Sequence, residues 1–240
     1  VRPPILTEHI GFRLGPRLNA AGRLTTAENA LRLLVTSDRA EAIALASELD
    51  GQNRDRQNVE RDIVRAAESR IAEENLFQSS AIVLGDRGWH PGVLGIVASR
   101  IARSFDRPAI MIGFDDSGIG KGSGRSITGL SLVAALARCA DHLEKFGGHE
   151  MAAGLTIQEN HFPAFVAAFQ KTCDELLAPE HLEPCLHLDD ELTLRELTWD
   201  LLRWHELLQP FGHGNPQPLF LARRVEPAAP PQILKEKHLV

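Results

Sequence analysis

A glycine-rich segment in the middle of the chain, GKGSGRS (Gly120–Ser126), has the composition of a phosphate contact. Glycines allow backbone N–H groups to approach an anion closely, because they carry no side chain. Lys121, Ser123, Arg125 and Ser126 add donors that form strong hydrogen bonds with phosphate oxygens. GxxxxGK[ST] cannot be laid over the segment, so it is not a P-loop. Phosphate binding is our interpretation, and an ordinary glycine-rich turn is the structural alternative.

The beginning of the chain carries a second group of phosphate-type donors. The segment FRLGPRLNAAGRL holds Arg13, Arg17, Asn19 and Arg23 between glycines and a proline. Guanidinium groups bind phosphates with two parallel hydrogen bonds, and such contacts hold a nucleic acid without reading its sequence. From the Gly, Pro and Arg content we predict irregular backbone over residues 1–24, with a solvated basic loop as the alternative.

Two histidines stand beside a helix start or a pair of glycines. His90, in GWHPG, precedes a predicted helix N-terminus, where N–H groups favour anions. Gly147 and Gly148 precede His149, which can donate to a phosphate or serve a structural role. The HExxH motif of zinc proteases does not fit, because Ala153 stands where its second histidine belongs.

Other catalytic centres are not visible in the sequence. There is no GxSxG motif and no clustered aspartate pair. Cys139, Cys173 and Cys185 are too few and too widely spaced for a disulfide framework or a paired zinc site. We therefore expect no metal-binding or catalytic residue in this sequence, and a reducing, cytoplasmic location.

The elements that position these residues begin with helices. Thr25 or Thr26 is the expected N-cap of a helix over residues 25–35, whose apolar residues recur at helical spacing as Ala27, Ala30, Leu31 and Leu34. A longer apolar period continues to Ile71, interrupted by the polar spacer DGQNRDRQN. This predicts either one long connecting helix that tolerates Gly51 or two helices that meet there.

From Ser80 the pattern becomes α/β. We expect a strand in SAIVLGD, a helix in HPGVLGIVASRIARSF, a strand in RPAIMIGF and a glycine-rich strand or turn in GIGKGSGRSI. A helix from Leu130 to Leu143, a strand in GLTI and an amphipathic helix in FPAFVAAFQKTCDELL follow. After Pro179, short alternating segments separated by prolines are typical of a small β-barrel.

Composition limits the class of protein. The 240 residues are 43% hydrophobic and 24% charged, which is typical of globular proteins and excludes disorder, collagen and membrane spans. The net charge is −6, but residues 151–240 hold 7 basic and 13 acidic side chains, so a basic site can exist nearer the N-terminus. The chain starts at Val1 and stops within an apolar alternation, so we expect a fragment cut at both ends.

Five segments in this order carry a resemblance to a known family. They are GPRLNAAGRL, HPGVLGIVASRI, GSGRS, FGGHEMAAGLTI and PFGHGNPQPLF. Together they resemble the C-terminal half of the RecJ family, bacterial single-stranded-DNA-specific exonucleases of the DHH phosphoesterase superfamily. The resemblance implies four regions: the end of the DHH catalytic domain (1–24), connecting helices (25–75), a DHH-associated α/β domain (76–178) and a partial OB-fold (179–240).

The resemblance also implies a function, namely 5′→3′ hydrolysis of single-stranded DNA to 5′-mononucleotides in DNA repair and recombination. The family uses Mn²⁺ or Mg²⁺, whose ligands are expected upstream of Val1, so the isolated chain is expected to be inactive. Helicases or single-strand-binding proteins are possible partners, and a membrane is not. The residues expected at the 5′-phosphate and the DNA are Arg17, Asn19, Arg23, Ser123, Gly124, Arg125, Ser126, Gly147, Gly148 and His149, with His90 and Lys121 as secondary candidates.

Two other functions remain open from the residues alone. A DHH-type phosphodiesterase of oligonucleotides or cyclic dinucleotides shares the glycine-histidine domain, although PFGHGNPQPLF favours the exonuclease. A non-catalytic nucleic-acid-binding module is the third reading. Tyrosine is absent, so base stacking would use Trp89, Trp199, Trp204, phenylalanine or arginine.

Overall fold

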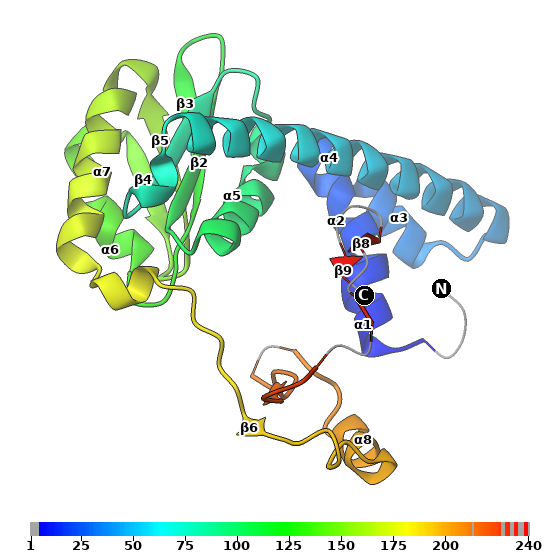
Figure 1. Cartoon of the computed structure of the whole chain (residues 1–240). Coiled ribbons are helices and arrows are strands. Elements are labelled where there is room, and N and C mark those ends of the chain that lie inside the picture. The colour runs from blue at the N-terminus through cyan, green and yellow to red at the C-terminus, as the bar shows by residue number, and fades with distance from the viewer. Residues whose placement is uncertain (1–4, 213, 227–228, 231–232, 235–237, 240) are drawn as a thin grey trace. The chain divides into compact units, whose positions relative to one another are not determined.

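The chain divides into two compact units, Val1–Pro184 and Cys185–Val240. The computed structural model (Figure 1) describes residues 5–212, 214–226, 229–230, 233–234 and 238–239. Within these residues, no helix is long and apolar enough to cross a membrane. The α/β class predicted from the sequence is confirmed, with helices and a mixed sheet in the first unit.

The first unit contains seven α-helices within its described residues. They are α1 (Thr7–His9), α2 (Gly15–Leu24), α3 (Glu28–Val35), α4 (Arg39–Glu73), α5 (Pro91–Phe105), α6 (Leu132–Ala137) and α7 (Phe162–Leu176). A π-helical segment, η1 (Ile10–Leu14), joins α1 to α2. Short 3-10 turns are η2 (Leu76–Gln78), η3 (Ala140–His142), η4 (Glu159–His161) and η5 (Pro179–Leu182).

The irregular backbone predicted for residues 1–24 is wrong in the described part of that range, because α1, η1 and α2 follow one another from residue 7. Pro16 lies in the first turn of α2, where proline disturbs no intrahelical hydrogen bond. Ala20 and Ala21 are fully buried, and α2 packs on α4. Burial of this small-residue face stabilises a helix whose glycines alone would disfavour it.

The next two helices form a hairpin. Thr25 ends α2 rather than beginning a helix, and its hydroxyl donates to the Ala21 carbonyl, so α3 begins later than predicted. Leu31 and Leu34 face solvent rather than the core. Helix α4 is one continuous helix through Gly51, capped by Asp38, whose carboxylate accepts from the Ala40 N–H.

One mixed sheet forms the centre of the unit. Its strands are β1 (Ile82–Asp86), β2 (Ala109–Phe114), β3 (Ile119–Arg125), β4 (Lys145–Gly148) and β5 (Ala152–Gln158). Their spatial order is β1-β2-β3-β5-β4, with β1 and β2 parallel and the other neighbours antiparallel. The glycine-rich segment of the sequence is therefore a central strand and not a turn.

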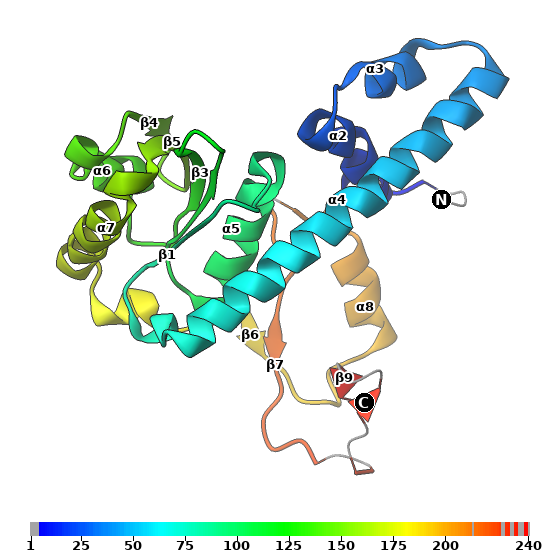
Figure 2. The same ribbon diagram turned by 90° about the horizontal axis from the view of Figure 1, so that it is seen from above.

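Two hydrophobic cores cover the two faces of this sheet. Helices α6 and α7 pack on one face around Ile110, Ile112, Leu155 and Phe165. Helices α4 and α5 lie on the other side, over β1 and β2 (Figure 2). The helix predicted from Leu130 to Leu143 is shorter, because α6 ends at Ala137 and η3 follows.

The second unit has little regular structure in its described residues. Helix α8 (Trp199–Glu206) is capped by Thr198, and β6 (Asp190–Glu191) pairs in parallel with β7 (Phe220–Leu221). Strands β8 (Ile233–Leu234) and β9 (His238–Leu239) pair with each other. The described part of this unit shows these two short ladders, and no closed barrel.

Candidate phosphate-binding site

Arg125 and Ser123 lie on the same face of β3, two residues apart. Arg125 Nη1 donates to Ser123 Oγ at 3.2 Å and to the Gly124 carbonyl at 2.7 Å. A Cβ at Gly95 of α5 would stand 2.9 Å from Arg125 Nη2 and 3.1 Å from Ser123 Oγ. The guanidinium and the hydroxyl therefore lie directly against α5, and a side chain at position 95 would require them to shift.

Arg23 reaches the same helix from the last turn of α2. Its Nη1 donates to the Gly92 carbonyl at 3.2 Å. A Cβ on Gly92 would lie only 2.0 Å from the Arg23 carbonyl oxygen, so the two backbones touch. This contact fixes Arg23 beside the first turn of α5, at the positive end of the helix dipole.

The two arginines influence each other electrostatically. Burial and the positive charge of Arg23 lower the pKa of the Arg125 guanidinium from its usual value. Within the described residues, no carboxylate forms an ion pair with either guanidinium. Two half-buried cations without a counter-ion repel each other, and a bound anion would relieve that repulsion. The arrangement is therefore suited to an anion, and best to one with more than one negative charge.

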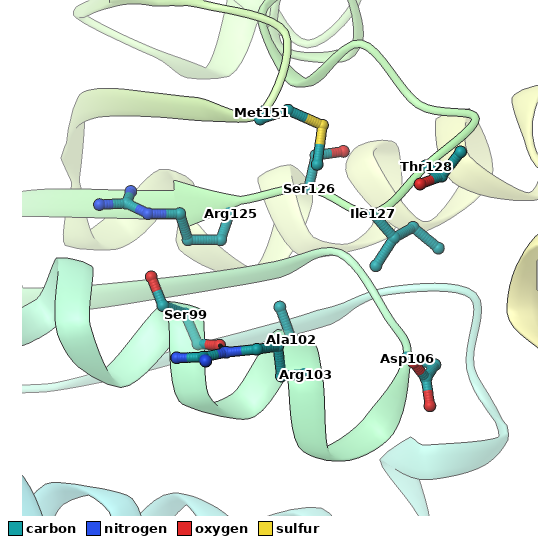
Figure 3. A pocket seen from close by; sticks show the side chains of 9 residues that line it. All are labelled: Ser99, Ala102, Arg103, Asp106, Arg125, Ser126, Ile127, Thr128 and Met151. Atoms are coloured by element: carbon teal, nitrogen blue, oxygen red, sulfur yellow. Dashed lines mark hydrogen bonds between the residues drawn. The ribbon is translucent and has the colours of Figure 1, made fainter. Parts of the chain in front are cut away.

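A hollow of about 550 Å³ adjoins Arg125 (Figure 3). Helix α5 supplies Ser99 and Arg103 to its wall, and the segment after β3 supplies Ile127 and Thr128. In Figure 3 the guanidinium of Arg125 points away from Ile127 and Thr128, above α5. The sequence prediction missed these α5 residues, although Gly95, Ser99 and Arg103 recur every four residues opposite the apolar face of the helix.

Three other predicted residues serve the fold. Arg17 Nε donates to Asp50 at 2.7 Å, which joins α2 to α4 and neutralises the guanidinium. The Ser126 hydroxyl donates to the Leu130 carbonyl at 2.7 Å. A Cβ on Gly124 would lie 2.9 Å from Leu132, so this glycine faces the core. Asn19 is exposed on α2.

The glycine-histidine segment lies on and directly after β4, the edge strand two strands away from β3. Gly148 has a φ of +150°, and a Cβ there would lie 2.4 Å from the Ala152 carbonyl, so the backbone requires glycine. Gly147 is exposed with open space around it. His149 is exposed, and its backbone N–H donates to the Ala152 carbonyl at 2.8 Å.

The remaining candidates differ in exposure. His90 caps α5, because its Nδ1 accepts from the Gly92 N–H at 3.1 Å. Lys121 is exposed on β3. Trp89 is buried among α4 and α5, so its proposed use in base stacking is wrong. Trp199 and Trp204 are 86% and 66% exposed.

The described residues do not fit a divalent metal centre. No group of three or more His, Cys, Asp or Glu side chains in this part of the chain is placed to hold an ion. Two-metal phosphodiesterases hold their ions about 3.5–4 Å apart with several such ligands. We therefore assign no catalytic step to a metal at the described residues.

Comparison with protein families identifies two domains. A DHHA1 domain matches residues 77–175, and a RecJ OB domain matches residues 188–240. The first covers the whole sheet of the first unit with α5, α6 and α7. The second covers α8 and the short strands of the second unit.

Curated relatives and solved structures are similar over most of the chain. The single-stranded-DNA-specific exonuclease RecJ of Bacillus subtilis is 40% identical over 212 residues, and that of Escherichia coli is 39% identical over 220 residues. Each match covers 88% of this chain, and 27% and 38% of the relative. The crystal structure of Thermus thermophilus RecJ in complex with Mn²⁺ is 42% identical, with a TM-score of 0.80, over 89% of this chain and 31% of that one. The corresponding Mg²⁺ complex has a TM-score of 0.77. The chain thus spans about a quarter to two fifths of these relatives.

Proposed function

Because the chain is a homologue of RecJ that carries a DHHA1 domain followed by a RecJ OB domain, we propose that it forms the DNA-binding part of a 5′→3′ single-stranded-DNA exonuclease. Its relatives named above are single-stranded-DNA-specific exonucleases. In this proposal the first unit holds the 5′ end of the strand. The second unit contacts the strand further along, with exposed Trp199 and Trp204 offering faces on which bases stack.

One observation carries the proposal: Arg23 and Arg125 converge on α5 beside Ser123, and neither guanidinium forms an ion pair with a described carboxylate. A terminal phosphate is dianionic at neutral pH, whereas an internal phosphodiester carries a single negative charge. Two unneutralised guanidiniums and a hydroxyl therefore favour the terminal group. This is how the site would distinguish the end of a strand from its middle.

The sequence-based division of the chain also enters the proposal. Residues 1–24 would end the catalytic domain, 25–75 would connect, 76–178 would bind substrate and 179–240 would begin the OB-fold. Divalent ions, Mn²⁺ or Mg²⁺, would be held by residues outside those described, since the described ones do not fit a metal centre. The setting we propose, which the sequence resemblance implies, is DNA repair and recombination in the cytoplasm.

The test compares 5′-phosphorylated with 5′-hydroxyl oligothymidylate for binding to this chain. We expect the wild type to prefer the phosphorylated strand. Arg125→Ala should remove a charge-assisted hydrogen bond of about 1.5–3 kcal/mol, a loss of roughly 10- to 150-fold, for that strand only. Arg125→Lys should recover part of it, because an ammonium group cannot form two parallel hydrogen bonds. Fluorescence anisotropy gives both affinities.

Arg138→Ala is the matched control. Arg138 is exposed after α6, on the far side of the sheet, where it pairs with Glu175. Its loss should leave both affinities unchanged. Equal losses for the phosphorylated and hydroxyl strands in Arg125→Ala would show that Arg125 supports general DNA binding or the fold, and would contradict the assignment of the 5′ end.

A further inference from the structure

Three strands present an open face beside the Arg125 site. On β3, the side chains of Lys121, Ser123 and Arg125 share one face, because alternate residues of a strand point the same way. The opposite face, with Gly120, Gly122 and Gly124, packs on the core under α6 and α7. Helix α5 contacts β2 and β3, whereas β5 and β4 have no comparable contact with it.

The strand register defines two cross-strand rows on this open face. Ser123 pairs with Gly154, which pairs with Gly147. Lys121 pairs with Thr156, which pairs with Lys145. Directly paired residues project from the same face of a sheet, so the first row is a flat strip and the second a row of donors.

The glycines of the first row are not required by packing. A Cβ on Gly147 would meet nothing within 4 Å, and one on Gly154 would only reach ordinary contact with the Gly122 carbonyl at 3.7 Å. Neither has the positive φ that favours glycine. This contrasts with Gly122, where a Cβ would lie 2.8 Å from Leu155. Glycine in the middle of a strand lowers stability, and packing does not explain Gly147 and Gly154. Their presence therefore indicates a role other than packing.

The lysines of the second row are both exposed, and they form no ion pair with a described carboxylate. The Lys121 charge does act on Asp115, whose pKa is lowered mainly by hydrogen bonds from Ser117 and Ile119 and also by this lysine. The nearest acid along the strand, Glu144, accepts a hydrogen bond from the Gln158 side chain instead. A hollow of about 570 Å³ is lined by Lys121, Lys145 and Thr156 together with the glycines of the strip.

We propose that this face is a track for the backbone of a single strand, with Lys121, Thr156 and Lys145 binding an internal phosphate beyond the Arg125 site. The inference rests on the proposed function and extends it to the nucleotides after the first. Lys121 is four residues from Arg125, or about 13–14 Å at the rise of a strand. The two lysines lie on β3 and β4, two strands apart across β5, which is about 10 Å. At that separation they stand on either side of a DNA backbone rather than in contact with each other.

Charge and shape both point to a nucleic acid backbone as the occupant. Lysine is a point charge that tolerates many phosphate orientations, which suits binding without reading sequence. The strip of Gly147 and Gly154 gives the sugar-phosphate chain close access to the sheet between the Arg125 site and the lysines. Phe146 and Leu155 also border the hollow, but strand alternation places their side chains on the opposite face, where they pack with the core under α6 and α7, so the open face offers an apolar partner little to bind.

The decisive experiment measures how the affinity of this chain for 5′-phosphorylated (dT)2 and (dT)12 depends on salt concentration. Each phosphate contact contributes about −0.7 to the slope of log K against log salt for single strands. Because the lysine row binds one internal phosphate, Lys121→Ala with Lys145→Ala should reduce the magnitude of the (dT)12 slope by about 0.7. The (dT)2 slope should stay unchanged, because (dT)2 ends before the lysine row. Lys171→Ala, an exposed lysine of α7 on the other side of the sheet, is the control and should change neither.

A second series tests the glycine strip. Gly154→Ala and Gly154→Thr should fold, with melting temperatures equal to or above the wild type, because the space is open and strands favour threonine. We expect (dT)12 binding to weaken progressively from Gly to Ala to Thr. Equal binding across the series, or an unchanged (dT)12 slope in the lysine variant, would overturn the track. In that case, loss of the 5′-phosphate preference in Arg125→Ala would leave the proposed function standing. A wild-type chain that binds neither (dT)2 nor (dT)12 would overturn both the track and the proposed function.

Discussion

Gly92 is the residue on which the position of Arg23 depends. The Cβ that alanine would add lies 2.0 Å from the Arg23 carbonyl oxygen, a backbone atom that cannot rotate away. We expect Gly92→Ala to displace α2 from α5 and to destabilise the unit by about 1–3 kcal/mol, the usual cost of overpacking. Urea unfolding measures the stability, and the loss of preference for a 5′-phosphate measures the displacement of Arg23.

Gly51→Ala is the matched control at the residue scale. Gly51 also lies within a helix, but nothing stands within 4 Å of its missing Cβ. There alanine should stabilise by roughly 0.5–1 kcal/mol, because it loses less backbone entropy than glycine on folding. A Gly92→Ala variant that is as stable as the wild type and keeps the 5′-phosphate preference would show that the α2–α5 contact does not position Arg23.

At the scale of elements, α4 contains a buried ionic cluster that the sequence presents as a polar spacer. Arg56 Nη1 and Glu60 Oε2 are 2.7 Å apart, with side chains 10% and 6% exposed, and Arg100 of α5 reaches Glu60 Oε1 at 3.2 Å. Asn53 accepts from Arg56 Nη2 at 3.2 Å. The cluster joins the connecting helix to α5, so it links the helical hairpin to the domain that carries the site.

Removing the acid from this cluster should be costly. Glu60→Ala leaves the Arg56 guanidinium buried without a counter-ion, and we expect a loss of about 3–5 kcal/mol in the free energy of unfolding. Urea titration followed by circular dichroism gives the value. Glu74→Ala, at the exposed Arg70–Glu74 pair on the same helix, should change little. Similar small effects from both variants would show that the buried cluster does not hold α4 to α5.

The same elements show what the sequence can predict. Strand β1, helix α5, strand β2 and helix α7 follow from periodicity, since each buries one face or both. Residues 1–24 were predicted irregular because Pro16 and the glycines are local signals, whereas the burial of Ala20 and Ala21 against α4 is tertiary.

Strand β3 illustrates the same limit at the site. Glycine disfavours strands, so the sequence GIGKGSGRSI could not be distinguished from a turn. The glycines within β3, Gly120, Gly122 and Gly124, are explained only by the core side chains that lie against them. The phosphate-type residues Ser123 and Arg125 could be found from composition. Their proximity to Arg23 could not be predicted, because Arg23 is far from Ser123 and Arg125 in the sequence. Only the packing of α2 and β3 on α5, at Gly92 and Gly95, brings these residues together.

At the scale of the whole molecule, net charge is a poor guide to the ligand. The chain carries −6, yet Arg23, Arg125, Lys121 and Lys145 lack ion-pair partners in the described residues. Other arginines are neutralised by carboxylates: Asp50 pairs with Arg17, and Glu159 pairs with Arg87. Other cations, such as Lys171 of α7, also lack an ion pair in the described residues, but Arg23, Arg125, Lys121 and Lys145 gather on the side of the sheet where α5 lies, and such a group of like charges attracts a polyanion.

The final prediction separates binding from hydrolysis. We expect this chain to bind single-stranded DNA but to release no mononucleotides with Mn²⁺ or Mg²⁺, because its described residues hold no cluster of ligands for one ion, let alone two. End-labelled single strands and chromatography of the products measure this. Release that co-purifies with the chain, stops when the ions are chelated and falls in the Arg125→Ala variant would contradict the prediction. It would place a metal site in this chain, and the Arg125 site would then hold the 5′ end within reach of it.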